Sequence, residues 1–171
     1  MSYADFARST FLNMLGTLDR LAAAAQDGGI DDKVLQSRLV DDMFPLELQF
    51  RVALNQVLLA LRQVGNAQVE LETTAYHDFA QVRARIAEVA ELVERSAPSS
   101  WAAPDAIVDL TLPNDVRFVM SSEADIRDWI LPNFYFHVAM AYALLRHAGL
   151  AIGKMDFIPH MARHRIDATD A

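Results

Sequence analysis

Two polar residues one helical turn apart interrupt an apolar stretch near the C-terminal end of the chain. They are Asn133 and His137, in the sequence LPNFYFH that begins at Leu131. If this stretch is helical, both side chains lie on one face and could hold a metal ion or a small polar ligand together. A neutral amide oxygen is a poor ligand for zinc or nickel, so the pair alone makes an incomplete metal site.

Three interpretations of His137 follow from its neighbours. It could be a metal ligand. It could also be an interior group among Phe134 and Phe136, with a ring hydrogen bond to Asn133 or to another amide or carbonyl. In a pocket without metal, His137 would accept or donate a proton while Asn133 orients it. The interior interpretation is favoured, and the other two remain open.

Two further pairs of residues, one of histidines and one of aspartates, could bind a metal ion or transfer protons. His160 and His164 share the same i, i+4 spacing, but they lack the glutamate of the zinc-protease motif and lie near the chain end. Asp41 and Asp42 could be paired carboxylates for acid–base work, yet their position before Pro45 favours helix capping. The sequence contains no nucleophile motif, phosphate-binding glycine loop or dinucleotide fingerprint.

Four segments with helical spacing of apolar residues must position these groups. They are predicted at residues 11–27, 46–61, 77–96 and 121–147, with a short helix near 34–39. Pro132 is expected to break or kink the last helix. Before it, residues 107–112 and 116–120 flank a turn at Pro113, which predicts a small β-hairpin. The chain after Lys154 is predicted to be irregular.

Composition limits the classes of function. The length of 171 residues fits one domain, and 53% hydrophobic with 22% charged residues is typical of a globular protein. There is no cysteine, no secretion signal and no apolar run long enough to cross a membrane, so we expect a cytoplasmic protein. The net charge of −8, with Lys33 and Lys154 as the two lysines, argues against a nucleic-acid partner.

The order of these elements resembles the DinB/YfiT-like superfamily of four-helix bundles. The motifs DMFPL from Asp42, LPNFYFH from Leu131 and GKxDF from Gly153 are similar to those of its uncharacterised branch of domains of unknown function. The resemblance covers residues 2–158. It implies an all-α, up-down four-helix bundle over residues 1–158, with a small β-hairpin before the last helix and an irregular tail over 159–171.

The resemblance also implies where a site would lie. Metal-binding members of the superfamily join one histidine of the second helix to an HxxxH pair on the fourth. His137 matches the second histidine of that pair, Asn133 stands in place of the first, and the second helix has no histidine. The polar residue of that helix nearest the expected depth is Gln49. The implied ligand pocket contains Asn133, His137, Gln49, Asp42 and Tyr142, with His137 as the metal ligand of an incomplete set.

Two classes of function are compatible with this resemblance. One is a non-catalytic module with a degenerate metal site, which binds a small molecule or forms a homodimer and needs no cofactor. The other is a metal-dependent thiol transferase or isomerase that uses zinc or nickel, as known relatives in the superfamily do. The degraded ligand set favours the first class. The aromatic run from Trp129 to Phe136 favours core packing or a subunit interface, so we expect a homodimer.

Overall fold

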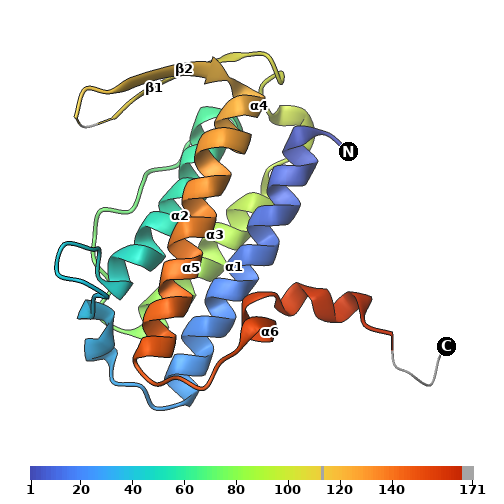
Figure 1. Ribbon diagram of the computed structural model, residues 1–171. Helices are drawn as coiled ribbons and strands as arrows, with labels where there is room; N and C mark the ends of the chain where they lie inside the picture. The colour runs from blue at the N-terminus through green and yellow to red at the C-terminus, as the bar shows by residue number, and fades with distance from the viewer. Residues whose placement is uncertain (113, 167–171) are drawn as a thin grey trace.

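The chain forms a bundle of four long helices with a β-hairpin at one end, as the computed structural model shows (Figure 1). Residues 1–112 and 114–166 are described. The long helices are α1 (Tyr3–Asp27), α2 (Leu46–Gln63), α3 (Phe79–Arg95) and α5 (Leu131–His147). The shorter elements are η1 (Asp32–Gln36), η2 (Pro98–Ser100), β1 (Ile107–Thr111), β2 (Arg117–Ser121), α4 (Ser122–Ala124), the π-helical segment η3 (Asp125–Ile130), α6 (Lys154–Phe157) and η4 (Pro159–His164). The predicted helical class, with a hairpin before the last long helix, is confirmed.

Local capping explains where some helices begin. Ser2 and Asp5 form a capping box at the start of α1, in which the Asp5 N–H donates to Ser2 Oγ at 3.1 Å. At α2 the predicted capping by Asp41 and Asp42 is wrong, because the N-cap is Pro45 and no side chain caps the helix. Both aspartates lie too far before the first turn and are exposed in the preceding loop.

A long connection determines the direction of the helices. Residues 64–78 run back along α2, held by the Glu72 N–H, which donates to Asn55 Oδ1 at 2.6 Å, and by the Tyr76 N–H, which donates to Glu47 Oε1 at 3.2 Å. Because this segment returns to the start of α2, α2 and α3 run in the same direction. Helices α1 and α5 run in the opposite direction (Figure 1).

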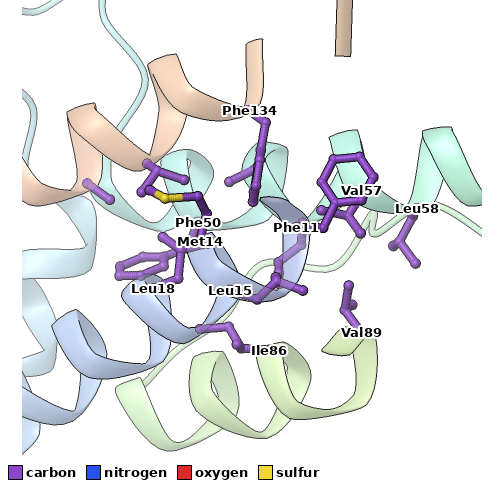
Figure 2. Packing of buried hydrophobic residues seen from close by; sticks show 14 of the residues in the cluster. Phe11, Met14, Leu15, Leu18, Phe50, Val57, Leu58, Ile86, Val89 and Phe134 are labelled. Atoms are coloured by element: carbon purple, nitrogen blue, oxygen red, sulfur yellow. The ribbon is translucent and has the colours of Figure 1, made fainter. Parts of the chain in front are cut away.

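All four long helices contribute to one hydrophobic core. Phe11 of α1 and Phe134 of α5 meet edge to face with ring centroids 5.6 Å apart, and both are fully buried. Figure 2 shows Phe50 of α2 and Ile86 of α3 in the same cluster. Large side chains on the inward stripe of each helix therefore hold the bundle together, as the helical spacing predicted. Among the described residues, none of the helices combines the length and the apolar character that crossing a membrane requires.

The β-hairpin packs through one face on η3, the segment that leads into α5. Val108 and Leu110 of β1 point inward and are buried, while Phe118 of β2 lies against Trp129 with ring centroids 5.4 Å apart. On the other face, Asp109 and Arg117 form an ion pair at 2.5 Å. The hairpin therefore covers the aromatic side chain that leads into α5.

The segment predicted as an irregular tail contains two helical elements that contact α1. Thr17 Oγ1 donates to the carbonyl oxygen of Phe157 at 2.9 Å, and Arg20 pairs with Asp156 at 2.8 Å. These long-range bonds to α1 stabilise α6 and orient η4 after it. Part of the predicted tail, residues 167–171, lies outside the described residues.

We expect Phe134→Ala to lower the free energy of unfolding by about 3–5 kcal/mol, because it opens a cavity between α1 and α5. Urea denaturation followed by circular dichroism measures the change. The matched control is Phe6→Ala on α1, where the ring is 52% exposed and the loss should stay below about 1 kcal/mol. Equal losses for the two variants would contradict this description of the core.

Candidate functional site

His137 on α5 and Gln49 on α2 are the predicted site residues that the structure brings into contact. His137 Nδ1 lies 2.8 Å from Gln49 Oε1. Both side chains are buried, with exposed fractions of 7% for His137 and 1% for Gln49. Because α2 and α5 pack antiparallel, each helix places one polar side chain at the same depth. The pair is a hydrogen-bonded polar contact inside an apolar interface.

The orientation of the Gln49 amide determines the tautomer of His137. Gln49 Nε2 donates to the carbonyl oxygen of Phe44 at 3.1 Å, which leaves Oε1 facing the imidazole. An amide oxygen only accepts, so His137 Nδ1 must carry the hydrogen. In the neutral ring, Nε2 then has a free lone pair, and no described residue donates a hydrogen bond to it.

Aromatic side chains surround the imidazole of His137. The Phe44 ring lies nearly parallel to it, at 11° with centroids 6.3 Å apart, and the Phe136 ring meets it edge-on at 5.2 Å. Burial lowers the pKa of His137 to about 4, because an imidazolium loses its hydration in these surroundings. At neutral pH the ring is therefore uncharged, and Nε2 can accept a hydrogen bond.

The other predicted pocket residues make different contacts. Asn133 is half-buried, and its Nδ2 donates to the carbonyl oxygen of Trp129 at 2.7 Å, one turn back on the same helix. Asp42 is exposed in the loop before α2. Tyr142 packs edge-on against Phe157 of α6, with ring centroids 5.7 Å apart. Of the five predicted pocket residues, His137 and Gln49 alone share a hydrogen bond.

The second histidine pair lies in η4, where the geometry separates the rings. A 3₁₀ helix has about three residues per turn, so residues at i and i+4 point about 120° apart. His164 Nε2 accepts a hydrogen bond from Arg163 Nε at 3.1 Å. His160 Nδ1 is buried and has no hydrogen-bond partner among the described residues. The spacing in the sequence therefore does not place both imidazoles on one face.

The donors around His137 do not fit a tight zinc or nickel site. The Gln49 oxygen already accepts the Nδ1 hydrogen, and the Asn133 amide donates to a carbonyl. Of these side-chain atoms, His137 Nε2 has a lone pair that is free to bind a metal ion. Within residues 1–112 and 114–166, no three His, Cys, Asp or Glu side chains are grouped so that they could hold a metal ion. Protein zinc sites normally use about three or four such ligands.

A buried acid that the sequence did not predict lies at the start of η3. Asp125 is fully buried, and neither carboxylate oxygen has a hydrogen-bond partner among the described residues. Burial raises its pKa to about 6. Trp129, four residues later, has a buried ring N–H that is also without a partner there. A π-helical turn shifts side chains away from the 3.6-residue period, so a helical pattern gives no signal for this burial.

Comparisons with known proteins agree with the described fold. Residues 4–158 match the profile of a family described as a domain of unknown function, DUF1993. The chain is also similar to a DinB family member protein from Shewanella denitrificans, whose crystal structure superposes with a TM-score of 0.77. The sequence identity is 26%, and the match covers 91% of this chain and 90% of that chain. No curated protein matches the chain. The DinB-like bundle predicted from the motifs is confirmed.

We expect His137→Ala to lower the free energy of unfolding at pH 7 by about 1–3 kcal/mol, because it leaves Gln49 Oε1 without a donor. The pKa of His137 falls from 6.5 in the unfolded chain to about 4 in the folded one. The unfolded state therefore gains protons first, and the advantage of the wild type over the variant should shrink as the pH falls from 6.5 to 4.

Urea denaturation of both proteins across this pH range measures the difference. His147→Ala is the control, since His147 is exposed in the last turn of α5 and its loss should change stability by less than about 0.5 kcal/mol. A wild-type advantage that does not change with pH would argue against a buried, neutral His137.

For Asp125 the expected dependence on pH has the opposite sign. Its pKa is about 6 in the folded chain, against 3.8 for a fully solvated aspartate, so the folded state binds the proton more tightly. The carboxyl group therefore costs no stability below pH 3.8 and costs most above pH 6. We expect Asp125→Asn to gain stability over the wild type as the pH rises from 4 to 7, by up to about 3 kcal/mol.

Thermal and urea denaturation at several pH values measure this gain. Asp128→Asn is the matched control, because Asp128 is exposed in the same segment and pairs with Arg127. If Asp125→Asn and the wild type keep a constant difference between pH 4 and 7, the carboxyl group is not the buried acid described above.

Proposed function

The chain belongs to the DUF1993 family of unknown function, and we propose that it acts as a non-catalytic homodimeric module. The observation that carries this proposal is an exposed apolar surface centred on the outer face of α5, which we name the α5 patch. It consists of the exposed residues Phe44, Pro132, Tyr135 and Phe136 and the half-buried Ala139 and Ala143. Large aromatic groups of this kind are enriched at protein interfaces and rare as exposed neighbours on monomers.

The composition of α5 supports an interface on this side. The helix has no charged residue from Leu131 to Leu145. Its inner face packs against α1 and α2, and Figure 1 shows its outer face uncovered by any other described element. Tyr135 and Phe136 are 42% and 52% exposed. A helix that is apolar on all sides is normally buried on all sides. We therefore expect another protein surface to cover the α5 patch.

A second copy of this chain is a partner that the α5 patch can accept. The net charge of −8 opposes association of two copies, but the patch carries no charged side chain, so no like charges meet in the contact itself. A two-fold axis through the α5 patch places the same aromatic residues on both sides. Tyr135 and Phe136 would then supply the central anchors of the interface.

The contacts of His137 support the non-catalytic part of the proposal. Gln49 Oε1 and His137 Nδ1 satisfy each other, and this buried bond favours one register of α2 against α5. The alternative, a metal-dependent thiol transferase or isomerase, would need further ligands, whereas Gln49 and Asn133 already make other hydrogen bonds. The hydrogen bond between His137 and Gln49 therefore uses two of the residues from which the resemblance would build a metal site.

Binding of a small molecule at His137 is a second candidate function. It is favoured by the free lone pair of Nε2, which a ligand with a hydrogen-bond donor could reach beside Phe44 and Phe136. The ¹⁵N chemical shift of Nε2 in purified protein separates the two roles. The shift of a bare lone pair supports the structural role, and a hydrogen-bonded shift that disappears after unfolding and refolding supports a carried ligand.

We expect the wild type to sediment as a dimer and Phe136→Glu to sediment as a monomer. The substitution removes a central aromatic anchor and places two like charges across the two-fold axis, which should weaken the dimer at least about 30-fold. Sedimentation velocity over a range of concentrations measures this change. Val119→Glu is the control, because Val119 is an exposed apolar residue of the hairpin, outside the α5 patch, and its variant should remain dimeric. A monomeric wild type would refute the proposal.

A further inference from the structure

The β-hairpin is followed directly by a buried acid, and we propose that β1 and β2 together form a lid on η3 that opens when Asp125 loses its proton. Figure 1 shows this hairpin lid at one end of the bundle, with α4 between it and the last long stretch of helix. Strand β2 ends at Ser121, α4 is a single turn, and Asp125 is the first residue of η3. A movement of the hairpin lid about α4 therefore shifts Asp125 directly.

Apolar contacts alone hold the hairpin lid against η3. Val108 and Leu110 of β1 are buried, and the Phe118 ring of β2 lies against the Trp129 ring with centroids 5.4 Å apart. Among the described residues, no hydrogen bond or ion pair joins residues 107–120 to a helix. Their polar bonds stay within the hairpin. An element with so few attachments can open without unfolding the bundle.

Two polar side chains without partners share the face of η3 on which the hairpin lid lies. A π-helical turn closes between residues i and i+5, so Asp125 and Trp129, four residues apart, project to the same side. Both carboxylate oxygens of Asp125 and the ring N–H of Trp129 are buried and have no hydrogen-bond partner among the described residues. An ionised Asp125 therefore lacks a compensating donor while the lid is closed, and it gains hydration when the lid opens.

No neighbouring charge offsets the ionised carboxyl group. Burial is the sole cause that raises the pKa of Asp125, to about 6. Tyr3 of α1 interacts with Asp125 and Glu123, but it stays neutral here because burial and these two charges raise its pKa above 10. Helix α5 has no charged residue near η3. The other charged side chains of the surrounding segments are exposed to water: Arg62, Asp105, Asp109, Arg117, Arg127 and Asp128.

The direction of the pH effect follows from the two environments of Asp125. Its pKa is about 6 under the closed lid, and a hydrated aspartate in the open state has the ordinary value of 3.8. Below pH 3.8 the group is protonated in both states, so the lid stays closed. As the pH rises toward 6, the open state releases the proton first and gains population. These two values correspond to an open fraction that rises about tenfold between pH 5 and 7.

Hydrogen exchange of the two indole N–H groups, followed by NMR on the full chain, tests the proposal. Each rate is divided by that of N-acetyltryptophanamide at the same pH, which gives a protection factor. We expect the protection of Trp129 to fall about tenfold between pH 5 and 7. Trp101 is the internal control, because its ring N–H donates to Ser96 Oγ at 2.7 Å, away from η3, and its protection should stay constant. Constant protection of Trp129, or an equal fall for both indoles, would overturn the proposal.

Two pairs of variants separate the acid from the lid. Asp125→Asn should abolish the pH dependence of Trp129 protection, whereas Asp128→Asn, which changes an exposed acid of the same segment, should behave as the wild type. Phe118→Ala removes a ring from the inner face of the lid and should lower Trp129 protection about fivefold at pH 5. Val119→Ala, on the outer face, should leave it unchanged.

Retained pH dependence in Asp125→Asn, or equal protection in Phe118→Ala and Val119→Ala, would contradict the lid. The hairpin lid lies outside the α5 patch, so these results leave the dimer test unaffected.

Discussion

Because α5 carries no charged side chain before its last turn, it can bury one face completely and still present an apolar face on the opposite side. Its buried face brings Phe134 against Phe11 and thereby joins α1 to α5 in the core. The same packing turns His137 toward α2, where an unpartnered imidazole would be costly. Gln49 meets that requirement, and the orientation of its amide leaves His137 Nε2 free at the edge of the α5 patch. Core, polar pair and exposed surface thus depend on one helix.

Two buried titratable groups, His137 and Asp125, are accommodated differently. His137 has a hydrogen-bond partner and a lowered pKa, so it remains neutral near pH 7 and strengthens the contact between α2 and α5. Asp125 has no such partner among the described residues and a raised pKa, so its ionisation above about pH 6 costs folding stability. Desolvation causes both shifts and acts in each case against the charged form.

Long connections matter as much as the helices for the final arrangement. The segment over residues 64–78 returns along α2 and is held by reciprocal bonds between Asn55 and Glu72, which makes α2 and α3 parallel. The hairpin covers Trp129 near the end of η3, and the elements after α5 return to α1 through Thr17 and Arg20. The segment over residues 64–78 and the elements after α5 thereby satisfy backbone or charged groups, while the hairpin adds an apolar contact.

Apolar periodicity, glycine and proline stops, and the alternation around Pro113 determined the helices, the hairpin and their order, because these signals are local to the chain. The LPNFYFH motif likewise indicated the DinB-like family and a polar position at His137. Asn133 bonds locally to the Trp129 carbonyl, four residues back, whereas tertiary structure decided the partner of His137, which is Gln49, 88 residues away. It also decided the burial of Asp125, since a π-helical turn departs from the period on which a helical pattern rests. Local spacing can place a side chain on a face, but the group that it meets there is set by the packing of distant segments.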